Sequence, residues 1–144
     1  MLNTWERYEL AGHEVDWYLP TPRERPLWGV IYLHGRDRVL LRDEPYFTYW
    51  LERLQLACVA PLGGEGWWLD RIAPSFDSQR SPEDFLLHEV LPWLEKRWQL
   101  RTGRIGLFGM SLGGHGALRL AFKYPKTFPV VAAISPTIDL YEAW

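Results

Sequence analysis

The segment GMSLGGHGAL, residues 109–118, constrains the fold more than any other stretch, because of what flanks it. The apolar run RIGLF lies directly before it and predicts a strand, and the residues up to 124 have the pattern of a helix. A G-x-S-x-G segment in this position predicts a tight strand-to-helix turn that holds Ser111 in a strained backbone conformation. Gly109 and Gly113 omit side chains that would collide with the neighbouring strand and helix. Residues 109–124 therefore predict such a turn and the helix after it.

The rest of the chain also alternates between strand and helix patterns. Residues 1–20 alternate polar and apolar residues around Ala11-Gly12, which predicts an antiparallel β-hairpin. LWGVIYL, ACVAPL and PVVAAIS are short apolar runs that are typical of buried strands. No repeat or linker divides residues 1–144, so we expect one α/β domain with a mainly parallel sheet between helices.

Two further helices are predicted. PYFTYWLERLQL has helical spacing, with Tyr46, Trp50 and Leu54 along one stripe. Ser81 is a candidate N-cap, followed by Pro82 at the first helical position. This second helix is expected to run to residue 98 and to kink at its internal proline, position 92. Its expected inward-facing residues are Phe85, Val90, Leu91 and Leu94.

Composition argues against several classes of protein. The formal net charge of −2 gives no electrostatic basis for binding nucleic acid or an anionic membrane surface. No apolar stretch approaches the roughly 20 residues of a membrane span, and the N-terminus lacks the pattern of a signal peptide. The single cysteine, Cys58, lies in an apolar run, which indicates a buried thiol in a reducing compartment. We therefore expect a cytoplasmic protein.

Ser111 is the candidate nucleophile. The predicted turn projects its hydroxyl above the carboxyl ends of the strands and aims the backbone N–H of Leu112 at a developing oxyanion. The positive end of the following helix adds to that stabilisation. The alternative is a glycine-rich turn with an idle serine, and the position between strand and helix favours the nucleophile.

The extended serine motif, SLGGHGAL followed by KYP and AAISP, resembles the esterase D group of α/β-hydrolases, which includes S-formylglutathione hydrolases. VIYLHG resembles the third strand and oxyanion loop of that family, and PLGGEGWWLD resembles the loop after its fourth strand. The resemblance covers the N-terminal portion of the family's domain. It implies an incomplete α/β-hydrolase fold that lacks its last strands, and no metal or organic cofactor.

The resemblance also implies roles for residues outside the serine turn. The backbone N–H of Arg36 would be the second oxyanion donor, and Gly35 would allow the loop to turn. The Arg36 side chain has two open interpretations, contact with an acidic substrate group or a surface ion pair. Trp67 and Trp68 would wall a substrate pocket beside the nucleophile, and packing over the core is an equal alternative.

A serine nucleophile needs a histidine base and an acid, which in α/β-hydrolases follow the serine in the order acid, then histidine. No histidine follows His115, which lies one helical turn after Ser111 and is interpreted as structural. His34 is a weak stand-in near the site, and His13 and His88 receive no role. Asp139 resembles the acid of some distant lipases, but it has no histidine to orient.

Two interpretations follow from the incomplete triad. The first is a serine hydrolase that cleaves small-molecule carboxylic esters or thioesters through an acyl-enzyme, with base and acid supplied from outside these residues. The second is a catalytically inactive half-domain or assembly partner. Because PVVAAIS would be an exposed apolar edge strand, we expect the C-terminal half of the domain or another chain to pair with it.

Overall fold

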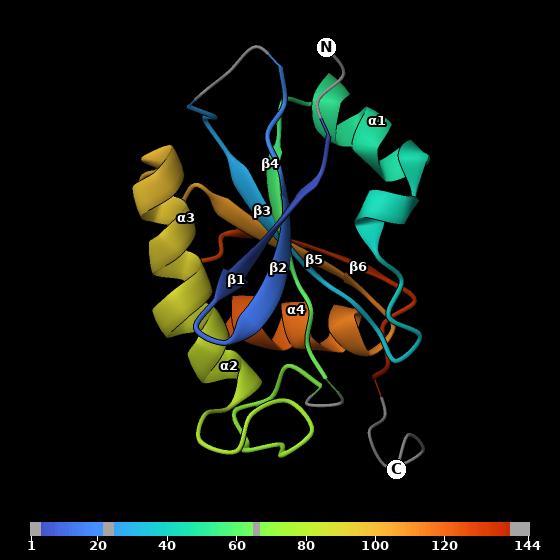
Figure 1. The fold of residues 1–144 in the computed structure, drawn as a ribbon, viewed down its shortest axis with the longest axis vertical. Helices are drawn as coiled ribbons and strands as arrows, with labels where there is room; N and C mark the ends of the chain where they lie inside the picture. The colour runs from blue at the N-terminus through green and yellow to red at the C-terminus, as the bar shows by residue number, and fades with distance from the viewer. Residues whose placement is uncertain (1–3, 22–24, 65–66, 139–144) are drawn as a thin grey trace.

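The computed structural model describes residues 4–21, 25–64 and 67–138. Six strands form one sheet in the order β1-β2-β4-β3-β5-β6 (Figure 1). The two pairs that include β2 are antiparallel, and the other three pairs are parallel. The strands are β1 (Glu6–Leu10), β2 (His13–Tyr18), β3 (Gly29–Leu33), β4 (Ala57–Pro61), β5 (Ile105–Met110) and β6 (Val130–Ile134).

Helices cover both faces of this sheet (Figure 1). One face packs against α2, the π-helical turn η2, α3 and α4, and the other packs against the short helix η1 and α1. Their bounds are η1 (Leu41–Asp43), α1 (Pro45–Arg53), α2 (Pro82–Phe85), η2 (Leu86–Val90), α3 (Leu91–Trp98) and α4 (Leu112–Lys123). The predicted α/β class with a mainly parallel, sandwiched sheet is confirmed.

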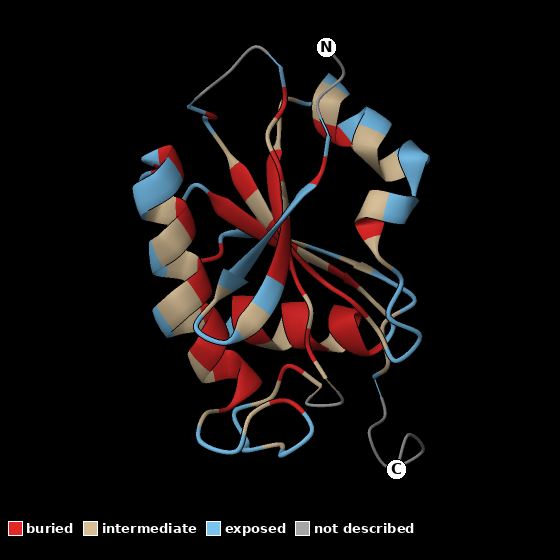
Figure 2. Ribbon diagram, viewed as in Figure 1, coloured by how far each residue is buried: buried red, intermediate tan, exposed pale blue. Residues whose placement is uncertain are grey.

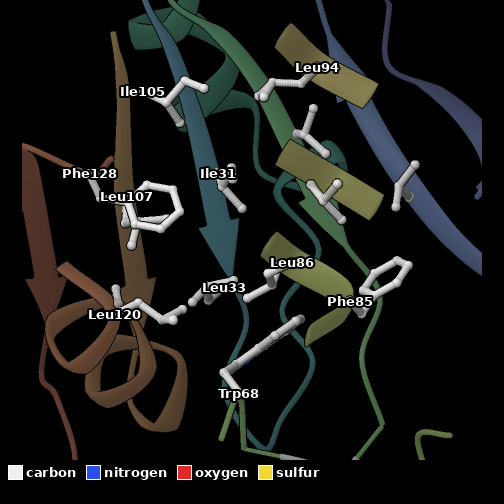
Figure 3. Packing of buried hydrophobic residues seen from close by; sticks show 14 of the residues in the cluster. Ile31, Leu33, Trp68, Phe85, Leu86, Leu94, Ile105, Leu107, Leu120 and Phe128 are labelled. Carbon is white, nitrogen blue, oxygen red and sulfur yellow. The ribbon is translucent and has the colours of Figure 1, made fainter. Parts of the chain in front are cut away.

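The larger hydrophobic core lies between the sheet and α2–α4 (Figure 3). Ile31 and Leu33 of β3 and Ile105 of β5 are fully buried there. Burial of each such side chain stabilises the fold by about 1.5–3 kcal/mol. A smaller cluster on the α1 face includes Cys58, so the predicted buried thiol is confirmed. Buried residues follow the centre of the sheet and the inner side of α4 (Figure 2).

Helix α1 forms as predicted, but the stripe that the sequence singles out does not face the core. Tyr46, Trp50 and Leu54 are exposed. The helix instead buries Leu51 and packs Phe47 against the smaller core, where Phe47 stacks on Phe108 of β5 at a ring-centroid distance of 6.3 Å. Both stripes are apolar, and contact with β5 decides which one is buried.

The helical segment 81–98 differs from the continuous kinked helix that was predicted. Ser81 caps it as expected, and its Oγ accepts a hydrogen bond from the Asp84 N–H at 3.1 Å. The five residues of η2 then form a π-helical turn directly before α3. Pro92 lies at the start of α3 and has no N–H for a helical bond, so a wider turn before it is physically reasonable. The turn shifts the buried face, so Leu86 is buried and Leu91 is only half-buried.

Strand β6 pairs with β5 and, within the described part of the chain, forms one edge of the sheet. Val130 and Ile134 on this strand are exposed. The described helices include none that is long and apolar enough to cross a membrane.

Candidate active site

Ser111 lies between β5 and α4, at the carboxyl end of the parallel strands. Its backbone has φ 55° and ψ −117°, a conformation that costs a non-glycine residue of order 1–3 kcal/mol. Hydrogen bonds from both sides hold it: its N–H donates to Ile134 O at 3.0 Å, and its O accepts from the Thr137 N–H at 3.0 Å. The side chain is exposed, and its Oγ lies 3.4 Å from Thr137 Oγ1.

Two glycines allow the chain to turn so tightly. A Cβ on Gly113 would lie 1.9 Å from Leu33 O, and a Cβ on Gly109 would lie 2.2 Å from Gly113 O. The start of α4 is therefore in backbone contact with the ends of both β3 and β5. Any larger side chain at either position would push α4 away from the sheet and displace Ser111.

The loop after β3 packs directly against the serine turn. A Cβ on Gly35 would lie 2.9 Å from Met110 O and 3.1 Å from Ser111 Cβ. Gly35, Arg36 and Leu112 all line a cavity of about 460 Å³ beside the turn. The structure thus brings together the two backbone segments that the sequence singles out as oxyanion donors, the loop after β3 and the start of α4. The first N–H groups of α4, which begins at Leu112, have no acceptor within the helix.

His34 joins the two loops that border this cavity. It is buried, and its Nδ1 lies 2.8 Å from Gly35 O. Its Nε2 lies 3.0 Å from Gly63 O and accepts a hydrogen bond from the Gly63 N–H at 2.9 Å. This pattern fits a neutral ring that carries its proton on Nδ1. Burial lowers the pKa of His34 below its usual value of 6.5. Both ring nitrogens are therefore engaged with backbone groups, and His34 acts here as a cross-link between loops.

The lowered pKa of His34 predicts a pH-dependent stability. Below about pH 6.5 the unfolded chain takes up a proton on this ring that the folded state resists, so stability falls as pH falls. One such proton gives a slope of at most about 1.4 kcal/mol per pH unit. We expect the free energy of unfolding, measured in urea, to fall from pH 7.5 to 5.5 with a slope that steepens below pH 6.5 and stays under this limit, and His34→Gln to flatten it.

His88 provides the matched control, because its ring is exposed and lies on the outer side of the π-helical turn. The His88→Gln variant should keep the slope of the unmodified protein. A slope that survives in His34→Gln would contradict the assignment to His34.

Trp67 and Trp68 both line the cavity, but their environments differ. Trp68 is only 3% exposed and packs into the larger core beside Leu33 and Phe85 (Figure 3). Its Nε1 donates a hydrogen bond to His34 O at 2.9 Å. Trp67 is half-buried, and the Arg36 guanidinium lies over its ring at 5.3 Å from the centroid.

An ion-pair network around the buried carboxylate of Glu83, which was not predicted from the sequence, holds the tryptophan loop. Arg119 of α4 donates to Trp68 O at 2.8 Å and to Glu83 Oε2 at 3.3 Å. Glu83 is 2% exposed, and Lys123 Nζ lies 3.0 Å from its Oε1. The basic residues four apart on α4 were the available signal, although their partner on α2 is distant in the sequence.

Two of the other histidine rings are engaged elsewhere. His13 Nε2 lies 2.9 Å from Asp77 Oδ2, and His88 Nδ1 lies 2.8 Å from Asp84 Oδ1. His115 is on α4, and its backbone N–H donates to Ser111 O at 3.1 Å. Among the described residues, no histidine ring nitrogen is hydrogen-bonded to the serine hydroxyl. Asp139 lies outside the described residues. Within the same ranges, no three His, Cys, Asp or Glu side chains gather as a metal site requires.

The sheet order, the flanking helices and the position of the serine turn define the α/β-hydrolase fold, and solved structures agree. The fold matches an S-formylglutathione hydrolase from Agrobacterium tumefaciens, with a TM-score of 0.75 at 20% identity. It also matches FphF, a fluorophosphonate-binding serine hydrolase of Staphylococcus aureus, with a TM-score of 0.80 at 16% identity. The matches cover 93% and 99% of this chain.

The chain belongs to the family described as Putative esterase, whose model matches residues 13–144. An esterase of Mycobacterium tuberculosis is 37% identical over 84 residues, which are 57% of this chain. The diacylglycerol acyltransferase/mycolyltransferase Ag85C of Mycobacterium avium is 28% identical over 94 residues, or 62% of this chain. The aligned residues span 18% and 27% of these two relatives, and 57% and 60% of the two solved structures.

Proposed function

We propose that the protein is a serine hydrolase that cleaves carboxylic esters or thioesters through an acyl-enzyme on Ser111. The main support is the backbone of Ser111, whose φ is 55° and which lies between a strand end and a helix N-terminus. This backbone presents an exposed hydroxyl. Strain of this kind persists where the surrounding structure enforces it, and it gathers at active sites. Family membership and the names of the relatives support the same reaction class.

The proposed reaction begins with attack of Ser111 Oγ on the acyl carbon, while a general base takes the hydroxyl proton. We propose the backbone N–H groups of Leu112 and Arg36 as the oxyanion hole, because both residues line the cavity beside the turn. Collapse of the tetrahedral intermediate expels the alcohol or thiol, which receives the proton from the base. Water, deprotonated by the same base, then hydrolyses the acyl-enzyme and releases Ser111.

Gly35, Trp67 and Trp68 line the cavity that would receive the substrate. We assign the aromatic rings the role of a pocket wall, with Trp68 fixed by its bond to His34 O. The reaction draws on no metal or organic cofactor. Thioesters enter the proposal because one structural neighbour is an S-formylglutathione hydrolase, and oxygen esters fit the same chemistry.

The general base and its acid are proposed to come from outside these 144 residues. The only hydrogen-bond partner of the Ser111 hydroxyl in the described ranges is Thr137, which cannot serve as a base. The exposed edge of β6 is the position where a C-terminal half of the domain, or another chain, would continue the sheet. The same observation favours one competing function, a non-catalytic half-domain or assembly partner that keeps the turn without its chemistry.

A fluorophosphonate probe distinguishes these two functions. Intact-mass measurement should show one adduct, formed with loss of fluoride, on the protein completed by a C-terminal segment of a family member, and none on the 144 residues alone. Peptide mapping should place the adduct on Ser111, and the control variant Ser75→Ala, altered beside a neighbouring cavity, should still be labelled. An adduct only in the completed protein would place the base outside the chain. No adduct in either form would establish the non-catalytic function.

A further inference from the structure

Two neighbouring cavities share Arg38 in their walls. The first is the 460 Å³ cavity beside the serine turn, and the second has a volume of about 390 Å³. Arg38, His34 and Gly64 line both, so these residues lie between the two spaces. A substrate that reaches Leu112 through the first cavity therefore has Arg38 within the same pocket.

The described side chains that line the first cavity carry no negative charge. Its charged lining residues are Arg36 and Arg38. The N-terminus of α4, which adds the positive end of a helix dipole, also opens into it at Leu112. A site of this sign favours a ligand with an anionic group over its neutral counterpart.

Arg38 is the arginine that remains available to such a ligand. Arg7, which lines the second cavity, is held by Asp16 at 2.8 Å and Glu14 at 3.6 Å. Arg36 lies over the ring of Trp67. The guanidinium of Arg38 is exposed, and none of the described residues forms a hydrogen bond or ion pair with it. Its five N–H donors are thus directed to solvent or to a ligand.

The backbone fixes Arg38 relative to the nucleophile. Its N–H donates to Gly35 O at 3.1 Å, and its own φ is 50°, so residues 35–38 form a tight turn. Gly35 in turn packs against Ser111 Cβ. The arginine is therefore carried on the loop that contacts the reacting serine.

We propose that Arg38 is a specificity-determining residue that binds an anionic group, such as a carboxylate or phosphate, on the acyl or alcohol part of the substrate. The inference rests on the proposed function of Ser111 and names the substrate class of that site. Arg38 forms charge-assisted hydrogen bonds to the anion and takes no part in the bonds that form and break. Esters and thioesters that carry a negative charge are then preferred over neutral ones of the same shape.

Binding of amide analogues tests this without requiring turnover. N-(4-nitrophenyl)succinamate and N-(4-nitrophenyl)butanamide differ in a terminal carboxylate against a methyl group on the acyl side. A third compound, 5-butanamido-2-nitrobenzoate, carries the carboxylate on the leaving-group side. Calorimetric titration should show about tenfold tighter binding for one of the two anions than for butanamide, since a charge-assisted hydrogen bond is stronger than a neutral contact. The arm that shows the preference identifies the charged side of the substrate.

In Arg38→Gln this preference should disappear while butanamide affinity stays the same, and Arg38→Lys should restore part of it. The control is Arg101→Gln, which removes the same charge at the amino end of β5, away from the site. Equal affinity for all three compounds, or a preference that persists in Arg38→Gln, would overturn the proposal. Hydrolysis of the matching esters is measured separately, so a failure of Ser111 chemistry is not mistaken for a failure of anion binding.

Discussion

Replacement of Ser111 by alanine is expected to lower kcat for a 4-nitrophenyl ester by about 10⁶-fold, the scale expected for loss of a serine nucleophile. The alanine has no hydroxyl to form the acyl-enzyme, whereas the oxyanion donors and the cavity remain. Alanine meets the same strain as serine at φ 55°, so the free energy of unfolding should change by less than about 0.5 kcal/mol. Steady-state kinetics of the catalytically active protein, with and without Ser111→Ala, measures kcat. Urea unfolding of the unmodified protein and of the variant measures the free energy of unfolding.

Thr137→Ala is the matched control, because the Thr137 hydroxyl lies within hydrogen-bond distance of Ser111 Oγ. This variant should keep kcat within about tenfold, since a hydroxyl at 3.4 Å can orient the serine but cannot take its proton. Turnover that survives in Ser111→Ala would rule out the acyl-enzyme. Loss of turnover together with loss of cooperative unfolding would mean that the serine is structural.

The serine turn was predictable because its constraints are local. Five consecutive residues specify a conformation that few other residue types can adopt, and the flanking apolar and helical patterns supply its context. The strands were predictable for a similar reason, since a continuous apolar run bounded by turns has few other folded states. The parallel direction of β3, β4, β5 and β6 then follows from the helices between successive strands.

The π-helical turn and the buried stripe of α1 could not be predicted in the same way. Pro92 has no N–H to donate to a helical hydrogen bond, so it predicts a local change in the helix. A kink and a π-helical turn can both accommodate this lost bond, and packing against the sheet decides between them. Helix α1 has two apolar stripes, and nothing local shows that Phe47 would meet Phe108. These features depend on contacts between residues far apart in the sequence.

The wall of the candidate site is the clearest case of such distant contacts. His34 bonds Gly63, Trp68 bonds His34, and Arg119 bonds both Trp68 and Glu83. Each bond joins residues 29 or more positions apart. The sequence shows the residue types but not their partners, so Trp68 could not be assigned to pocket or core in advance. The structure shows it in both, with its ring in the core and one side on the cavity.

Replacement of Gly113 by alanine is expected to destabilise the protein by about 4 kcal/mol or more. In an open helix the same change stabilises by about 1 kcal/mol, so helix propensity alone predicts the opposite sign. Here the new Cβ would lie 1.9 Å from Leu33 O and 2.6 Å from His34 O, and both atoms belong to backbone that no rotamer change can move. Urea unfolding monitored by circular dichroism should show the loss directly.

Gly103→Ala is the matched control for the steric argument. Gly103 has a φ of 83°, so alanine is strained there, but its Cβ would come no closer than 3.5 Å to any other group. This variant should lose only about 1–2 kcal/mol. If Gly113→Ala were as stable as the unmodified protein, α4 would not be in backbone contact with β3, and the position of Ser111 would need another explanation. If Gly113→Ala lost no more than Gly103→Ala, the contact with Leu33 O would be too loose to account for the glycine at position 113.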